Sequence, residues 1–407
     1  MNQDYKELKE CVCCDSENLK MVLDFNEQPL ANNSLKTADE IENVYPLKLN
    51  YCSDCTHLQL KHAVNPDLMF RQYLYVSGTS QTLKDYFRWF AKYTSDYVGE
   101  KNNGKILDIA CNDGTLLDVY SNIENFKYQT YGIDPSVNLH KVSSIRHTVE
   151  LDYLNWNYAK KNKNMFSTIV AQNVMAHNGY PKEFLEMCKM MLVDDGYIFI
   201  QNSQADMVKN NEFDTIYHEH ISFYSIKSFK TLARQAGLIV VDVKKVPIHG
   251  NSNIFVLSKN LNILETNIVD EFVLNDVSIY QYAYKCYKVI NELTKELEKL
   301  RKENYKIVGY GSAAKGNTLI NASNIKLDYI VDDNPLKQGL FTPGARIPIV
   351  SILELEKETD KLCVIPLAWN FFDEIKQKCL THINVDDLIF VKYFPQFKII
   401  EEQNSRS

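Results

Sequence analysis

The sequence predicts an α/β protein with two mostly parallel sheets, preceded by a small cysteine-rich segment. Two stretches, one beginning near residue 105 and one near residue 306, each join a short apolar strand to a helix through a loop of small residues. Apolar strands and amphipathic helices alternate after each of these stretches, which is typical of doubly wound sheets. Two CxxC pairs within residues 11–55 indicate a third part that is stabilised by metal.

Composition places the chain among ordinary globular proteins. Its 407 residues suggest two or three domains, and 45% apolar with 24% charged residues is the usual balance. The net charge of −7 argues against a broad affinity for nucleic-acid phosphates. The N-terminus lacks the pattern of a signal peptide, and no apolar run approaches the ~20 residues that span a bilayer. We therefore expect a cytoplasmic protein with no membrane partner.

The cysteine-rich segment carries the pairs Cys11/Cys14 and Cys52/Cys55. A segment of this size buries little apolar surface, and a structural metal commonly compensates for that. The spacing predicts a four-thiolate zinc site, which is structural because four thiolates leave no open coordination position. The alternative is four reduced cysteines without metal. Cys13 is either an alternative ligand or a bystander.

The middle of the chain, residues 80 to 260, begins with "GKILDIACNDGTLLDVY", which predicts a strand over 105–110 and a helix starting near Thr115. Further strands are predicted to end at Asp134 and near His177. A helix and the strand 197–200 come next, and then a helix that Gly237 stops. The segments "IVVDVKKV" and "NIFVLS" predict two closing strands, and such an antiparallel pair is typical of class I methyltransferases.

An acid at one strand end, a small-residue loop and a second acid at the next strand end suit an adenosine ligand. S-adenosylmethionine fits best, with Asp108 near its amino-acid end and Asp134 accepting from the ribose hydroxyls. NAD is the rival, but the loop lacks the G-x-G-x-x-G pattern. The residues predicted to bind the cofactor are Asp108, Ala110, Asn112, Gly114, Asp134 and Asn173.

The last segment opens with a long helix, about 277–303, followed by "YKIVGYGSAAKGNTLI". Its glycines at 309, 311 and 316 lie where a nucleotide-binding fold needs tight turns and close backbone approach. This predicts a second Rossmann-like unit. Lys315, Asn317 and Thr318 lie at the mouth of the loop and are suited to holding diphosphate or sugar oxygens. The alternative for Thr318 is a helix cap.

The motifs "NDGTLL", "FDTIYHEH", "GYGSAAKGNTLIN", "PGARIPI" and "LAWNF", in this order after the CxxC pairs, resemble the sugar C-methyltransferases. The resemblance covers essentially the whole chain. It implies a zinc-binding domain (1–70), a class I methyltransferase domain that binds S-adenosylmethionine (71–265) and a C-terminal Rossmann-like domain for the nucleotide sugar (266–407). It also implies methylation at C3 of a nucleotide-linked 4-keto-6-deoxy sugar. We expect a monomer.

The segment "YHEH" matches the chemistry that this reaction needs. A carbon next to a ketone becomes nucleophilic once a base removes its proton and donors stabilise the enolate. We predict His220 as that base, with Glu219 as the alternative base and Tyr217 as an orienting or sugar-contacting group. His218 is expected to be structural. A metal site and plain core polarity are the other interpretations, but the two histidines lack the i, i+4 spacing of a zincin.

Similar enzymes supply further candidates. Tyr75 matches a tyrosine that meets the sugar, with Tyr73 as the alternative in register, and His177 lies over the site at a strand end. The chain departs from the family in two places. It reads "QNSQ" after strand 197–200, where relatives have an acid and a proline, and "HGNSNI" at 249–254 in place of "HGGSLR". The substrate contacts His249 and Asn251 are carried over from that second motif, whose arginine is missing.

Two other functions compete with C-methylation. One is O- or N-methylation of the same kind of sugar, which would not need deprotonation of carbon. The other is a zinc-ribbon protein that binds nucleic acid. The acidic balance and the lack of a basic cluster beside the cysteines argue against it.

Overall fold

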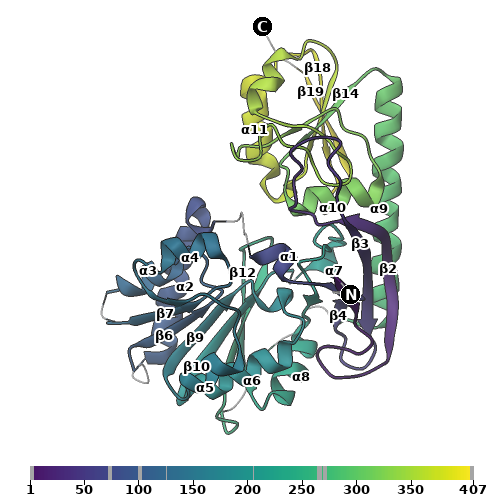
Figure 1. Ribbon diagram of the computed structural model, residues 1–407. Coiled ribbons are helices and arrows are strands. Elements are labelled where there is room, and N and C mark those ends of the chain that lie inside the picture. Colours follow the sequence, from purple (N-terminus) through teal and green to yellow (C-terminus); the bar gives the residue numbers. More distant parts are fainter. Residues whose placement is uncertain are drawn as a thin grey trace. The chain divides into compact units, whose positions relative to one another are not determined.

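The computed structural model describes residues 4–71, 76–99, 103–124, 126–204, 206–263, 268 and 273–403. The chain forms two compact units, each assembled from separate segments (Figure 1). Unit 1 comprises Met1–Lys20, Asn50–Ala205 and Glu219–Leu274, and unit 2 comprises Met21–Leu49, Asp206–His218 and Asn275–Ser407. The predicted class, α/β with two Rossmann-like sheets and a four-cysteine segment, is confirmed.

Unit 1 is built on a seven-stranded sheet of order β12-β13-β10-β9-β6-β7-β8. The strands from β10 to β8 are parallel, whereas β13 is antiparallel to both β10 and β12, as the predicted closing pair requires. The strands are β6 (Lys105–Ile109), β7 (Gln129–Ile133), β8 (Thr148–Glu150), β9 (Phe166–Gln172), β10 (Leu192–Asn202), β12 (Ile239–Val246) and β13 (Ser252–Ser258).

Helices cover this sheet because each presents an apolar stripe to it. Phe229 of α8 stacks on Phe255 of β13 with ring centroids 3.9 Å apart, and Phe90 of α2 meets Phe199 of β10 edge to face. The helices are α2 (Gln81–Val98), α3 (Thr115–Ser121), α4 (Val137–Ser143), α5 (Trp156–Lys161), α6 (Pro181–Met191) and α8 (Ile226–Gln235).

The strand order reverses between β6 and β9. The chain runs from β6 outward to β8 and then returns to the other side of β6 as β9. In doubly wound sheets the crevice at the carboxyl ends of two such strands is the usual ligand site. The loops that follow β6, β7 and β9 should therefore carry the site of unit 1.

Short strands join the cysteine-rich segment to the rest of unit 1. β1 (Tyr5–Glu7) pairs with β5 (His62–Val64), and β4 (Leu58–Leu60) pairs with β11 (Ser222–Phe223), both antiparallel. β11 begins two residues after His220. The end of the "YHEH" segment is thus attached by backbone hydrogen bonds to the strand that follows the second CxxC pair.

Unit 2 contains a six-stranded sheet of order β16-β15-β14-β17-β18-β19, parallel except for the edge strand β19. Its order reverses between β14 and β17. The strands are β14 (Lys306–Tyr310), β15 (Ile330–Val331), β16 (Ile349–Val350), β17 (Leu362–Pro366), β18 (Asp387–Lys392) and β19 (Lys398–Gln403). The helices are α7 (Met207–Asn210), α9 (Asp276–Lys302), α10 (Ala314–Ser323) and α11 (Phe372–His382).

The loop between β14 and α10 depends on its glycines. Gly311 has a φ of 96°, which favours glycine. A Cβ atom on Gly316 would lie 2.9 Å from Leu367 Cβ and 3.1 Å from the Gly311 carbonyl oxygen. The first turn of α10 therefore packs directly on the loop and on the residue after β17, which is the close approach that the sequence pattern predicts.

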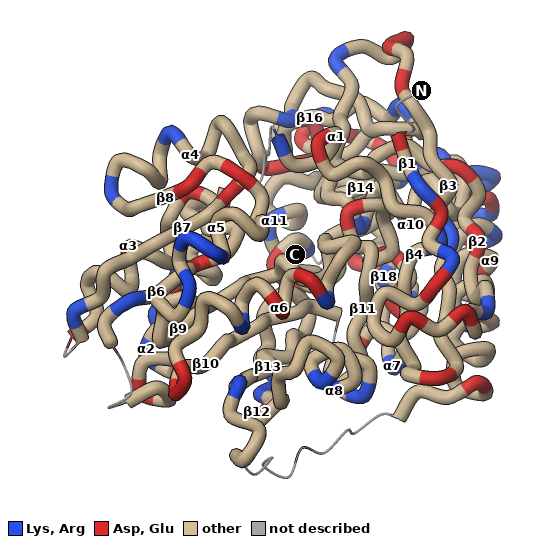
Figure 2. The backbone as a smooth tube through the Cα atoms, turned by 60° about the horizontal axis from the view of Figure 1, so that its bottom comes forward, with Lys and Arg blue, Asp and Glu red and all other residues tan. Residues whose placement is uncertain are grey.

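Acidic and basic residues are interspersed along the backbone of both units (Figure 2). In α9 the buried positions are apolar and the charges of "KELEKLRKE" lie on its exposed face. Among the described residues, no helix is long and apolar enough to span a membrane.

Candidate functional site

A cavity of about 590 Å³ opens in unit 1 at the carboxyl ends of β6, β7 and β9. Its volume falls within the range of small-molecule and cofactor sites. The loops after the three strands contribute Ala110, Asn112, Asp134 and Asn173, while Phe70, Tyr153 and Leu154 add an apolar wall. Four of the six residues predicted to bind the cofactor therefore line one cavity.

The loop after β6 is folded around the Asp134 carboxylate. Oδ2 accepts a hydrogen bond from the Asn112 backbone N–H, and Oδ1 accepts one from that of Ser136, both at 2.8 Å. A carboxylate has about four lone-pair sites, so these bonds leave room for a hydroxyl donor. Burial raises the pKa of Asp134, and the hydrogen bonds from Ser136 and Asn112 oppose this. These N–H bonds favour the ionised acceptor.

Two side chains of the same loop hold the segment before α2. Asn112 Oδ1 accepts from the Ser77 backbone N–H at 3.0 Å, and Asp113 Oδ2 accepts from the Gly78 backbone N–H at 3.0 Å. A Cβ atom on Gly78 would lie 2.5 Å from Asp113 Oδ2. The side chain of Asn112 therefore shapes the loop.

Asp108 and Gly114, the other two residues predicted to bind the cofactor, are not part of the cavity wall. Asp108 is buried in β6, and burial raises its pKa well above the usual range, with Asp134 and Asp113 adding to the effect. Gly114 has a φ of 82° and precedes α3, so its role in the loop is conformational. Direct contact of either residue with the cofactor stays a prediction.

The segment "YHEH" forms a turn, with no helix or strand at 217–220. His218 is buried in unit 2, where its Nε2 lies 3.1 Å from the Tyr45 carbonyl oxygen. Glu219 and His220 are buried in unit 1. The His220 ring lies 5.1 Å from the His177 ring, centroid to centroid. His177 lines the cavity, so the turn at Glu219 and His220 reaches the cavity wall through this pair of rings.

His177 is fixed in one tautomer. Its Nδ1 lies 2.6 Å from the Glu219 carbonyl oxygen, which only accepts, so Nδ1 carries the proton. Burial lowers the pKa of His177, although hydrogen bonds to the Glu219 and Asn173 backbones oppose this. The ring is therefore neutral near physiological pH.

Several predicted residues lie elsewhere or outside the described residues. Tyr73 and Tyr75 fall within 72–75, outside the described residues. His249 and Asn251 lie in the turn between β12 and β13, with φ values of 53° and 83°. Neither is part of the cavity wall. Their contact with a substrate stays a prediction.

In unit 2, Lys315, Asn317 and Thr318 lie in the first turns of α10. Asn317 Nδ2 donates to the Ala31 carbonyl oxygen at 2.7 Å. Asn317 Oδ1 and Thr318 Oγ1 are buried, and neither has a hydrogen-bond partner in the part of the chain that the structure describes. Thr318 does not cap α10, whose N-cap is Ala313 and has no side-chain cap. Unpaired buried acceptors beside a glycine loop are groups that a polar ligand could satisfy.

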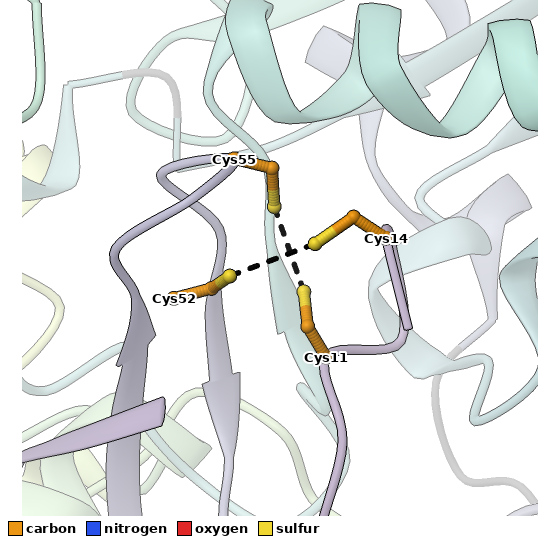
Figure 3. A group of neighbouring side chains, drawn as sticks. All are labelled: Cys11, Cys14, Cys52 and Cys55. Atoms are coloured by element: carbon orange, nitrogen blue, oxygen red, sulfur yellow. Dashed lines mark hydrogen bonds between the residues drawn. The ribbon is translucent and has the colours of Figure 1, made fainter. Parts of the chain in front are cut away.

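The four predicted zinc ligands meet in unit 1 (Figure 3). Their sulfur atoms lie within 4.8 Å of one another, with Cys11 and Cys55 3.5 Å apart and Cys14 and Cys52 3.6 Å apart. Zn–S bonds of about 2.3 Å in a tetrahedron separate the sulfurs by about 3.8 Å. The donor set fits a structural zinc ion. Cys13 is fully buried and is not one of the four.

Three family models match the chain, in the order that the motifs predict. A zinc binding domain matches residues 11–70, a methyltransferase domain 81–243, and a C-methyltransferase C-terminal domain 266–395. This chain is an S-adenosylmethionine-dependent methyltransferase. The predicted resemblance to the C-methyltransferases is confirmed.

The methyltransferase is also similar to individual proteins. It is 26% identical over 395 residues to the C-methyltransferase NovU of Streptomyces niveus, covering 92% of this chain and 93% of that one. Among solved structures, the PH0226 protein of Pyrococcus horikoshii is 16% identical, with a TM-score of 0.36, over 48% of this chain and 96% of that one. A SAM-dependent methyltransferase from Aquifex aeolicus is 18% identical, with a TM-score of 0.34, over 45% and 98%.

Sequence reasoning missed several residues of the site. Gln204 contacts the His220 ring at 3.1 Å, and Tyr153 and Leu154 line the cavity. In the sequence, the polar run "QNSQ" appears only as a departure from the family pattern. A tyrosine and a leucine shortly after the short strand β8, at positions 153 and 154, were the available signal for the apolar wall.

Freshly purified methyltransferase should contain one zinc ion per chain by elemental analysis. Cys11→Ser should lose that zinc and unfold at a lower temperature, because metal binding contributes folding free energy directly. Cys13→Ser is the matched control, since it removes a neighbouring buried thiol outside the four-sulfur cluster. Loss of zinc in Cys13→Ser but not in Cys11→Ser would show that the ligand set is wrong.

Asp134→Asn should weaken S-adenosylmethionine binding about tenfold or more by isothermal titration calorimetry. A hydrogen bond to a charged group contributes about 1.5–3 kcal/mol, and the amide keeps only one acceptor oxygen. Asp194→Asn is the control, because Asp194 is an exposed acid of the same unit. An unchanged dissociation constant in Asp134→Asn would place the cofactor elsewhere.

Proposed function

We propose that this methyltransferase adds a methyl group to C3 of a nucleotide-linked 4-keto-6-deoxy sugar through an enolate. The observation that carries the proposal is the turn at Glu219 and His220, held against His177 at the wall of the cofactor-sized cavity. Methyl transfer to oxygen or nitrogen needs no base for a carbon-bound proton. A buried histidine pair and a carboxylate beside the cavity suit carbon deprotonation.

His220 is the proposed base. Histidine in general has an unperturbed pKa of about 6.5, which suits this residue type to proton transfer near physiological pH. Adjacent residues of a strand point to opposite faces, but the segment is a turn, which removes that obstacle to a joint role of Glu219 and His220. Glu219 is the alternative base. Tyr217 is proposed to orient the base or to contact the sugar.

Gln204 is proposed to set the tautomer of His220. Its Nε2 lies 3.1 Å from His220 Nδ1, and its Oε1 is buried with no hydrogen-bond partner within the described ranges. An amide turned by 180° would place Oε1 against Nδ1–H and satisfy both groups. His220 Nε2 would then carry the lone pair that takes the C3 proton.

His177 is proposed to support this base, with its own proton held on Nδ1 by the Glu219 carbonyl. That hydrogen bond also fixes the backbone of Glu219, so the histidine and the turn position each other. S-adenosylmethionine supplies the methyl group. The residues lining the cavity, Asp134 among them, would bind and orient it.

The nucleotide sugar is proposed to be held by the glycine loop of unit 2. Support comes from the unpaired buried acceptors Asn317 Oδ1 and Thr318 Oγ1 and from the cation Lys315 beside them on α10. Lys315 would bind phosphate oxygens, and the two acceptors would receive hydroxyl donors. The similarity of residues 266–395 to a C-methyltransferase C-terminal domain supports a role in the same reaction.

Solvent deuterium exchange tests both the reaction class and the base. In heavy water, with S-adenosylhomocysteine in place of the methyl donor, the enzyme should exchange the proton at C3 of a nucleotide 4-ketosugar. His220→Asn should abolish exchange while calorimetry shows both ligands still bound, because the amide keeps polarity but takes up no proton.

Glu219→Gln is the paired variant. Exchange that persists in His220→Asn and vanishes in Glu219→Gln would make the carboxylate the base. Methyl transfer by wild-type enzyme without any exchange at C3 would favour the O- or N-methyltransferase alternative.

A further inference from the structure

Unit 2 buries a carboxylate that the proposed chemistry does not use. Asp214 is fully buried, and its Oδ2 accepts a hydrogen bond from Trp369 Nε1 at 2.8 Å. Its other oxygen, Oδ1, is buried and has no hydrogen-bond partner among the described residues. Leaving a buried carboxylate oxygen unpaired costs stability. A buried carboxylate that is retained despite this loss of stability is a candidate functional group.

Asp214 and Trp369 lie beside the cation of the glycine loop. Lys315 follows β14 and Trp369 follows β17, and these two parallel strands are the neighbours at which the strand order reverses. Lys315 Nζ lies 5.0 Å from the centroid of the Trp369 ring, within cation–π range. The charge of Lys315 also lowers the pKa of Asp214, so the ammonium and the carboxylate interact. The motifs "FDTIYHEH", "GYGSAAKGNT" and "LAWNF" therefore meet in one cluster.

Asp214 is the acid of this cluster that titrates near pH 7. Burial raises its pKa to about 7, Lys315 opposes this, and Glu212 adds to it. Burial also raises the pKa of Glu212, again opposed by Lys315. The remaining titratable groups that face Asp214 are Tyr282 and Cys286 of α9 and Tyr393 after β18. Burial raises the pKa of each, so all three are neutral at this pH.

We propose that Asp214 and Trp369 position Lys315 for the diphosphate of the nucleotide substrate, and that Asp214 takes up a proton when the diphosphate binds. Asp214 holds the indole N–H of Trp369, and the indole ring holds the ammonium of Lys315. A bound phosphate competes with Asp214 for that ammonium and brings negative charge near the carboxylate. Both effects favour the protonated form of Asp214.

The affinity for the diphosphate should therefore depend on pH. The carboxyl has a higher pKa in the bound state than in the free state, so binding is strongest where Asp214 is already protonated. Affinity should fall as pH rises above about 7, by up to tenfold for each pH unit until the pKa of the bound state is reached. This inference rests on the proposed function, because it takes a nucleoside diphosphate as part of the substrate.

Isothermal titration calorimetry with UDP and dTDP tests the inference. Titrations at pH 7.5 in two buffers of different ionisation enthalpy give the number of protons taken up on binding. Wild-type enzyme should take up a fraction of a proton and lose affinity between pH 7 and 9. Asp214→Asn keeps an oxygen for Trp369 Nε1 and removes the titrating group. This variant should take up no proton on binding, and its affinity for the diphosphate should not change between pH 7 and 9.

Glu212→Gln is the matched control and should keep the uptake, because it removes the neighbouring buried acid only. Trp369→Phe is a second variant in case Asp214→Asn folds poorly. It keeps a ring for Lys315 but removes the N–H that lowers the pKa of Asp214, so the fall in affinity should begin at a higher pH.

Uptake in Asp214→Asn equal to that of wild type would overturn the inference, and so would the absence of any diphosphate binding. Diphosphate binding without proton uptake would overturn it alone and leave the proposed methylation standing. Proton-linked binding by an enzyme that methylates no nucleotide sugar would instead support the inference and refute the proposed function.

Discussion

Four cysteine sulfurs within 4.8 Å of one another define the part of unit 1 to which the Glu219–His220 turn is attached. Cys52 N–H donates to the His57 carbonyl oxygen at 2.8 Å and closes the turn before β4, and β4 then pairs with β11 directly after His220. His57 Nε2 lies 3.2 Å from Ser222 Oγ, and burial lowers the pKa of this histidine to about 4, so the contact stays neutral. A zinc ion in this site would stabilise β4, and through it the position of the Glu219–His220 turn.

In both units a carboxylate accepts hydrogen bonds from backbone N–H groups of a neighbouring loop. Asp134 accepts from the N–H of Asn112 in the loop after β6 and from Ser136 two residues on. Asp332 accepts from the N–H of Ser312 in the loop after β14, at 2.7 Å, and from Asn334 two residues on, at 2.8 Å. In each sheet an acid after the second strand shapes the loop after the first. The recurrence explains how two loops of different sequence, one with a single glycine, form the same kind of strand–loop–helix unit.

Much of the fold follows from the sequence because its signals are local. The CxxC spacing brings four sulfurs together, and the apolar runs before Asp108 and Gly311 become β6 and β14. Local sequence signals do not predict how the segments of unit 2 assemble. Residues 21–49 and 206–218 join the C-terminal segment through contacts between positions far apart in the chain, which local pattern does not encode.

In the candidate site, too, some residues are predictable from local sequence and others depend on long-range packing. Asp134 was predictable because an acid at that strand end has a recurring role. The contact of His177 with the Glu219 carbonyl and that of Gln204 with His220 depend on how a turn packs against a strand end. The contact between Trp369 and Asp214 was likewise not predictable, because 155 residues separate them in the sequence. Motif order indicated that these segments matter, but only the packed structure shows which atoms meet.

The central claim is that a new carbon–carbon bond forms next to a ketone. The most direct measurement is two-dimensional NMR of the product made from a nucleotide 4-keto-6-deoxy sugar and S-adenosylmethionine labelled with ¹³C in its methyl group. The account predicts a labelled methyl carbon coupled directly to C3 of the sugar. A labelled methyl bonded to a sugar oxygen or nitrogen would contradict it.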